Sequence, residues 1–143
     1  MEIRPKFGIG PLLFGMKQKD VQAVLGKPDK QFEDDDQNII YVYNAPKLRL
    51  TFYEDEGFRM GYIISSHPDL VLYQQFVIGK TADEIKKLLQ TKQYKNWEIE
   101  EFDLAENHFN EDHWLILQTE YNEIVKVELG VVAKNADDFD WKF

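Results

Sequence analysis

An internal repeat places two short helices at corresponding positions of the chain. The segment 15–25 aligns without gaps with the segment 79–89, so that Asp20 matches Glu84. Both segments carry apolar residues at positions i, i+3 and i+4, which lie on one face of a helix. These residues are Val21, Val24 and Leu25 in the first segment and Ile85, Leu88 and Leu89 in the second. The repeat therefore predicts two amphipathic helices, each with one face towards a core.

The ends of the two predicted helices differ. Thr81 and Glu84 have the spacing of a capping box at the start of the second helix. The first helix keeps the acid, Asp20, but has no hydroxyl at the matching position. Gly26 followed by Pro28 is typical of a helix end. We therefore expect a weaker start and a well-defined end for the first helix.

After each predicted helix the apolar period changes to two, which indicates β-strands. The predicted strands are 38–43, 47–53 and 58–65 in the first half and 97–104, 113–119 and 124–132 in the second. Turns are expected at 54–57 and 120–123, where acidic residues, asparagine and glycine interrupt the pattern. The short apolar segment 70–78 is expected to be a strand or an extended link.

These elements predict an α+β fold made of two similar halves. Each half is expected to hold one helix followed by about three antiparallel strands, with the helices packed on the sheet. Neither a short helix nor a three-stranded sheet buries its apolar face alone, so we expect residues 1–143 to form one domain. The pseudo-repeats would span 8–66 and 72–133, followed by an acidic and aromatic tail at 134–143. One long sheet and two sheets back to back both fit this pattern.

The segment 8–28 has the pattern of an entry motif: a glycine, a short apolar stretch, Gly-Met, a helix with an acid–valine pair, and Leu-Gly-x-Pro. It resembles the opening of the β-lactamase-inhibitor-protein superfamily and of the small lipoprotein of the outer-membrane protein assembly machine. Similar openings occur in immunity-like proteins of bacterial toxin systems. The resemblance implies one or two helices before an antiparallel sheet, two such halves in tandem, and a binding role. Because the chain has no cysteine, it cannot carry the lipid anchor or the disulfides of those relatives.

Charge and hydropathy limit the class of partner. The net charge of −9 repels phosphate, which disfavours nucleic acids and anionic membranes and favours a basic protein. No apolar run approaches the roughly 20 residues of a membrane-spanning helix. The N-terminus lacks the apolar stretch of a signal peptide. We therefore expect a cytoplasmic bacterial protein with no membrane or nucleic-acid partner.

The sequence predicts no catalytic, cofactor or metal site. His108 and His113 lie five residues apart, in what reads as a loop entering a strand, and no third ligand accompanies them. Asp34 and Asp36 have the spacing of the start of a calcium loop, but Ile39 stands where that loop needs glycine. Nucleophile, Walker and dinucleotide-binding motifs are absent from the sequence.

Two acidic segments are the candidate partner-binding residues. The first is the run Asp34, Asp35 and Asp36, and the second is the tail from Asp137 to Trp141, with Asp138, Phe139 and Asp140 between them. In an extended tail, Phe139, Trp141 and Phe143 share one face and the acids lie on the other. Aromatic anchors among acids suit a basic protein partner, whereas docking of these aromatics on the chain's own core is the alternative.

Three classes of function fit these observations. The first, which we favour, is a non-enzymatic protein-binding module of the immunity type, which neutralises a basic protein toxin. The second is a structural or adaptor module that self-associates through a sheet edge. The third is a small hydrolase or metal-dependent enzyme that uses His108 and His113.

Overall fold

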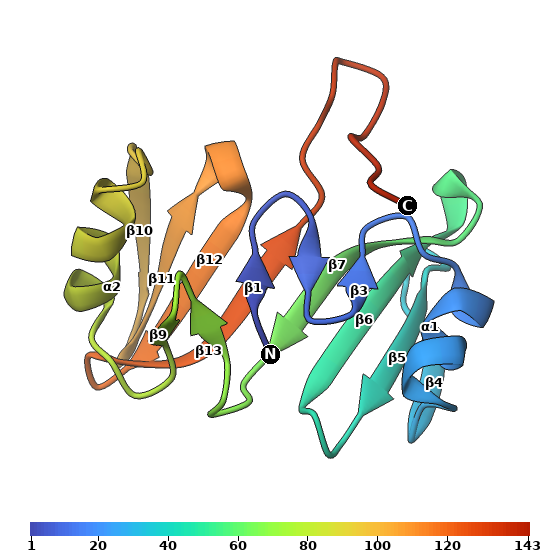
Figure 1. Cartoon of the computed structure of the whole chain (residues 1–143), viewed down its shortest axis with the longest axis horizontal. Coiled ribbons are helices and arrows are strands. Elements are labelled where there is room, and N and C mark those ends of the chain that lie inside the picture. Colours follow the sequence, from blue (N-terminus) through green and yellow to red (C-terminus); the bar gives the residue numbers. More distant parts are fainter.

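One antiparallel sheet of eight strands dominates the computed structural model, which describes residues 1–143 (Figure 1). The strand order is β10-β11-β12-β13-β7-β6-β5-β4, so the pairing of β13 with β7 joins two groups of four strands into one sheet. The first group is β4 (Lys30–Glu33), β5 (Ile39–Tyr43), β6 (Leu48–Tyr53) and β7 (Arg59–Ser65). The second is β10 (Trp97–Phe102), β11 (Ala105–Asn110), β12 (Leu115–Glu120) and β13 (Glu123–Gly130).

The predicted fold class was wrong. The chain is mostly β, with 43% of its residues in strands and 16% in helices, and not an α+β tandem of one helix and three strands. Both predicted helices form, as α1 (Gln18–Leu25) and α2 (Ala82–Gln90), but four strands follow each of them in one continuous sheet. We expected residues 1–143 to form one domain with a separate tail, and this stays a prediction.

Two strands were missed because their sequences lack a strand pattern. The strand β4 contains a single apolar residue, Phe32, and follows Pro28, which indicated only the end of the preceding helix. The strand β11 reads Ala-Glu-Asn-His-Phe-Asn, and residues such as asparagine and glutamate are depleted in strands. It forms because β10 and β12 pair with it on both sides. His108 therefore lies within a strand and not in a loop.

Short extended segments cover the middle of the sheet. A three-stranded meander forms from β1 (Ile3–Arg4), β2 (Gly8–Ile9) and β3 (Leu12–Leu13). A hairpin forms from β8 (Val71–Leu72) and β9 (Gln75–Phe76), so the predicted extended segment 70–78 reverses direction. In Figure 1 these pieces lie over the middle of the sheet, between α2 at one end and α1 at the other.

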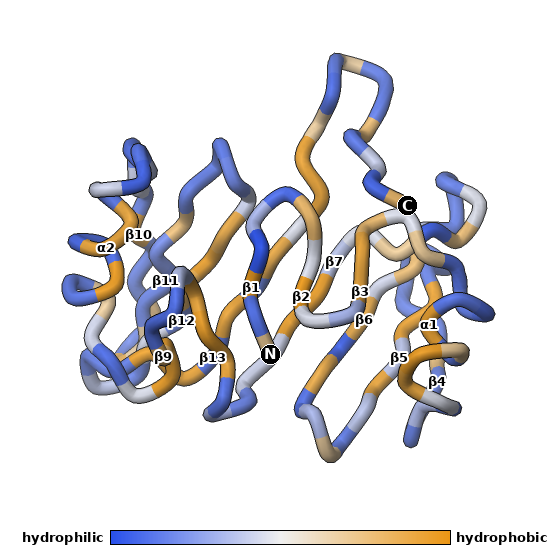
Figure 2. Tube along the Cα trace, viewed as in Figure 1, coloured by the Kyte–Doolittle hydropathy of each residue, from blue (hydrophilic) through white to orange (hydrophobic).

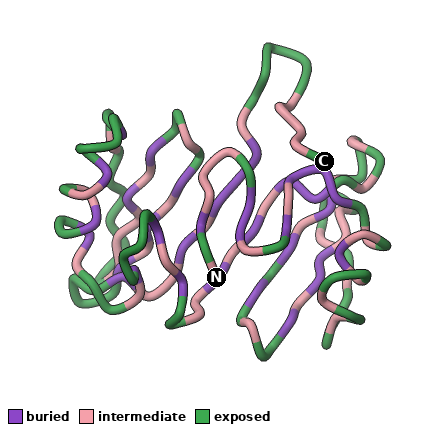
Figure 3. The backbone as a smooth tube through the Cα atoms, in the orientation of Figure 1, coloured by how far each residue is buried: buried purple, intermediate pink, exposed green.

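The core lies on one face of the sheet only. A row of cross-strand partners, Tyr41, Leu50, Ile63, Leu129 and Leu115, is buried. The next row points to the opposite face and is exposed or half-buried: Val42, Arg49, Ile64, Glu128, Ile116, Phe109 and Glu98. Figure 2 shows the alternation of hydropathy along the strands, and Figure 3 shows the burial that follows from it. Helices and meander thus cover one face and leave the other open.

The helix ends follow the sequence. In α2 the Thr81 hydroxyl accepts a hydrogen bond from the Glu84 backbone N–H at 3.2 Å, and the Glu84 carboxylate accepts from the Thr81 N–H at 2.9 Å. In α1 only the second type of bond is present, from the Lys17 N–H to Asp20. Gly26 ends α1 with a φ of 79°. Neither helix has the length and apolar content that a bilayer crossing needs.

Candidate functional site

Asp34 organises the acidic turn between β4 and β5. Its carboxylate accepts hydrogen bonds from the backbone N–H groups of Asp36 and Asn38, each at 2.9 Å. Desolvation opposes the ionisation of Asp34, but the hydrogen bonds from Asn38 and Asp36 outweigh it and lower the pKa of this carboxyl below 3.8. The Asn38 side-chain oxygen accepts from the Glu54 N–H at 3.0 Å. The acidic turn is thereby tied to the short 3-10 helix η1 (Glu54–Glu56).

The C-terminal tail returns to the same end of the molecule. Its loop is held by Asn135, whose side-chain oxygen accepts from the N–H groups of Asp137 and Asp138, each at 2.9 Å. Phe139 then stacks on Tyr53, which precedes η1, with 6.0 Å between ring centroids and 27° between ring planes. The loop before Phe139 projects beyond the sheet (Figure 1).

Three segments distant in the sequence therefore meet at one cleft. The cleft has a volume of about 450 Å³, and its lining residues are Asp36, Asn38, Tyr53, Glu54, Asp55 and Phe139. We call these six residues together with Asp34, Asp35, Asp137 and Asp138 the acidic-aromatic surface. Of the eight predicted partner-binding residues, Asp36 and Phe139 line the cleft itself, and Asp34, Asp35, Asp137 and Asp138 lie within two residues of them in the sequence. Tyr53, Glu54 and Asp55 were not predicted, because one sequence does not show which turns meet.

The last two predicted residues make contacts within the chain. Asp140 forms an ion pair with Lys142 at 2.9 Å, and the Arg59 guanidinium lies 5.8 Å from the centroid of the Trp141 ring. Phe139 and Trp141 are both half-buried against the core, whereas Phe143 is 59% exposed. The tail thus docks on its own core through these two aromatics and leaves Asp137 and Asp138 exposed.

The histidines have separate surroundings. His108 is buried, and its Nε2 lies 3.0 Å from a Glu106 carboxylate oxygen. His113 stacks on Tyr94 with 3.6 Å between centroids, and its Nδ1 lies 2.8 Å from the Asn110 side-chain oxygen. Burial, with a smaller contribution from Lys6, lowers the pKa of His113 below 6.5. No group of three metal-ligating side chains is present, and the two histidines share no hydrogen bond.

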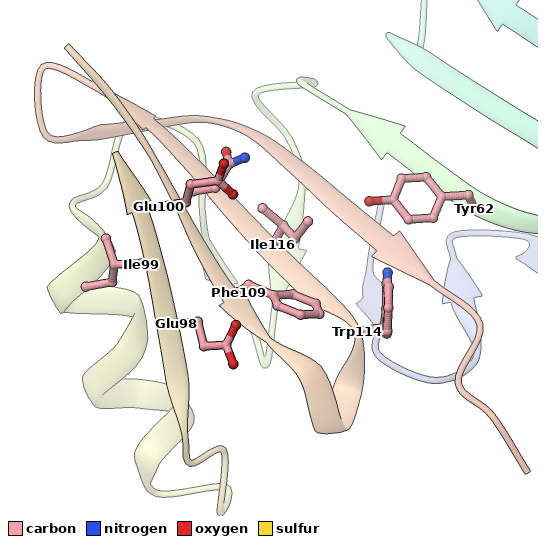
Figure 4. Close-up of a pocket in the computed structure, with 8 residues that line it drawn as sticks. Tyr62, Glu98, Ile99, Glu100, Phe109, Trp114 and Ile116 are labelled. Carbon is pink, nitrogen blue, oxygen red and sulfur yellow. The ribbon is translucent and has the colours of Figure 1, made fainter. Parts of the chain in front are cut away.

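A second hollow lies on the open face of the sheet and was not predicted (Figure 4). It has a volume of about 330 Å³ and is lined by Tyr62, Glu98, Ile99, Glu100, Asn107, Phe109, Trp114 and Ile116. We call it the open-face pocket. A sequence signal for it exists in the uninterrupted apolar run Leu115-Ile116-Leu117, because a strand apolar on consecutive positions presents apolar side chains to both faces.

A glycine makes room for the aromatic wall of this pocket. Trp114 has a left-handed conformation with a φ of 45°, and its indole lies directly over Gly130 of β13, where a Cβ atom would overlap the ring. Phe109 packs against Trp114 edge to face at 5.0 Å. Tyr62 donates a hydrogen bond to Glu128 at 2.6 Å, and burial together with this bond raises the pKa of the Tyr62 hydroxyl. The aromatic wall is therefore held in place from two sides.

The comparisons with known proteins give a fold likeness only. No family model and no curated protein matches the sequence. A solved extracellular protein containing an SCP domain from Bacillus anthracis is similar in structure, with a TM-score of 0.54 and 13% identity over 80% of this chain. A cysteine-rich secretory protein from Staphylococcus aureus aligns with a TM-score of 0.47 and 12% identity, also over 80% of this chain. The chain spans 43% of the length of each of these proteins.

These findings correct two predictions. The resemblance to the β-lactamase-inhibitor-protein superfamily and the outer-membrane assembly lipoprotein was wrong, since the similar structure contains an SCP domain and the chain is a mostly-β fold without the expected tandem. The prediction of a cytoplasmic protein is contradicted as well, because the similar protein from Bacillus anthracis is an extracellular protein.

Proposed function

We propose that this chain is a protein-binding module whose acidic-aromatic surface binds a basic protein. The observation that carries the proposal is the meeting of two acidic turns at one cleft, where the tail residue Phe139 stacks on Tyr53. Neutralisation of a basic toxin, as by an immunity protein, is the finer form of the same proposal.

The charge of this surface supports an electrostatic role. Asp35, Asp36, Glu54 and Asp55 are exposed, and none of them has a lysine or arginine nitrogen within 4.0 Å. Clustered charges of one sign raise the rate of encounter with an oppositely charged partner. The hydrogen bonds that link Asp34 to Asn38 and Asn38 to Glu54 fix the two turns relative to each other, so the charges are held in place before a partner arrives.

The test is a comparison of three tagged proteins used to capture partners from the lysate and the culture medium of the native cells. These are the natural chain, D35K/D36K on the acidic-aromatic surface, and E120K/E123K as a matched control. Glu120 and Glu123 are also exposed and lie at the far turn between β12 and β13. We expect the natural chain and the control to capture the same basic protein at low salt, and the D35K/D36K variant to lose it. Equal capture by all three proteins would contradict the proposal.

A further inference from the structure

The open-face pocket has walls of two chemical kinds, apolar and anionic. Phe109 of β11, Trp114 just before β12 and Ile116 of β12 form an apolar wall. Glu98 and Glu100 stand two residues apart on β10, so both carboxylates project from the same face of the sheet. Register places Glu98 directly opposite Phe109 on the neighbouring strand. The carboxylates and the aromatic rings therefore border the same space (Figure 4).

The anionic side of the pocket is uncompensated. The chain has one lysine–carboxylate ion pair and one close His108–Glu106 contact, and neither includes Glu98 or Glu100. Both glutamates are exposed at the edge of the sheet. Directly opposite Glu100 lies Asn107, whose side-chain oxygen is buried and has no hydrogen-bond partner. An unpartnered buried acceptor is uncommon, because its desolvation is not offset by a bond.

We propose that the open-face pocket binds the side chain of an arginine on a partner protein. A guanidinium group is planar and stacks on aromatic faces such as those of Trp114 and Phe109. It carries five N–H donors, which suffice for the two carboxylates of β10 and for the unpartnered oxygen of Asn107. A neutral apolar ligand offers no donor to any of these three acceptors, so the pocket favours a cation with several N–H groups.

This inference does not depend on the proposed function. The open-face pocket and the acidic-aromatic surface have no residue in common. The aromatic and anionic walls of the pocket lie on β10, β11 and β12, whereas the acidic turns of the surface flank β5 and β6. An arginine could reach the pocket from the same basic partner or from another protein. The acidic-aromatic surface attracts by net charge, whereas the pocket recognises the shape and donors of one side chain.

The test is a titration of the 15N-labelled chain with Nα-acetyl-arginine amide, followed by NMR at the Trp114 indole N–H. The chain has three tryptophans, so the Trp114 signal is assigned by its loss in Trp114→Phe. We expect a saturable shift at Trp114, and binding weaker by about tenfold for Nα-acetyl-citrulline amide, which has the same shape without the charge. Equal binding of the two amides, or no saturable shift at Trp114, would overturn the proposal.

Variants separate this proposal from the proposed function. We expect E98Q/E100Q to weaken the arginine amide by about tenfold, since each exposed carboxylate contributes modestly. The matched control E120Q/E123Q should bind as the natural chain does. The D35K/D36K variant should also bind the arginine amide normally, even though it loses the basic protein. Unchanged binding of the arginine amide by E98Q/E100Q would contradict the proposal that the open-face pocket binds arginine. It would not affect the proposal for the acidic-aromatic surface.

Discussion

The two helices occupy opposite ends of one sheet but are attached to it by different means. α2 buries three apolar residues, Ala82, Ile85 and Leu89, and both of its capping bonds are made. α1 buries only Val21 and leaves Val24 49% exposed. The hydroxyl of the buried Tyr41 compensates by accepting hydrogen bonds from Gln18 and Gln22 at 2.8 and 2.7 Å. One helix is therefore docked by apolar burial and the other chiefly by polar bonds.

The largest expected loss of stability is at α2, the helix that is docked by apolar burial. Leu89 is fully buried, so Leu89→Ala should lower the free energy of unfolding by about 2–5 kcal/mol through lost burial and a residual cavity. Val21→Ala removes fewer buried carbons from the core-facing side of α1, so it should lower the free energy of unfolding by less. Chemical denaturation of both variants measures the difference. Equal losses would show that α1 depends on apolar burial as much as α2 does.

The polar attachment of α1 is tested by Tyr41→Phe. This change removes the shared acceptor of Gln18 and Gln22 while it keeps the buried ring, and should cost about 1–2 kcal/mol. Tyr121→Phe is the matched control, because Tyr121 is 75% exposed. Hydrogen exchange should show faster opening of α1 than of α2 in Tyr41→Phe. A loss of protection spread evenly over both helices would argue against a separate attachment.

Substitutions at the N-terminal caps of the two helices should change the stability less. Thr81→Ala removes the hydroxyl that caps α2 and should cost about 1 kcal/mol. Lys17 stands at the matching position of α1, and its side chain accepts no capping bond, so Lys17→Ala should be nearly neutral. The measurement is the midpoint of chemical denaturation of each variant, compared with that of the natural chain. A comparable loss in Lys17→Ala would mean that the asymmetry between the caps has no energetic consequence.

The smallest effect is a pH dependence at the α2 end, where His113 packs on Tyr94. The folded pKa of His113 is lowered, so the unfolded chain binds the proton more readily as the pH falls below 6.5. Stability should therefore decrease from pH 6.5 towards the lowered pKa, and this slope should diminish in His113→Gln. His67→Gln serves as the control. An unchanged slope in His113→Gln would assign the pH dependence to other groups.

Features that depend on neighbouring residues could be predicted from the sequence, and features that depend on contacts between distant residues could not. The capping box at Thr81 and the end of α1 at Gly26 depend on neighbouring residues, and both were confirmed. The strand β11 was missed because its pairing with two neighbours, not its composition, makes it a strand. Val24 was expected to be buried, but the polar docking of α1 leaves it outside.

The candidate site shows the same division. The acidic run and the tail were identified as segments, because charge and aromatic content are local properties. Their meeting with Tyr53 and Glu54 depends on sheet order and on the path of the tail, which a single sequence does not determine. The open-face pocket was missed for the same reason, since its residues come from separate strands and a glycine that admits Trp114.

The most direct test of the central claim is the salt dependence of the association rate with the captured basic protein, measured for the natural chain and for D35K/D36K. Electrostatic attraction to the acidic-aromatic surface predicts that the rate for the natural chain falls by at least about tenfold from low to moderate salt. The variant should associate slowly at both salt concentrations. An association rate that is insensitive to salt and the same in both proteins would contradict the claim that this surface binds the partner.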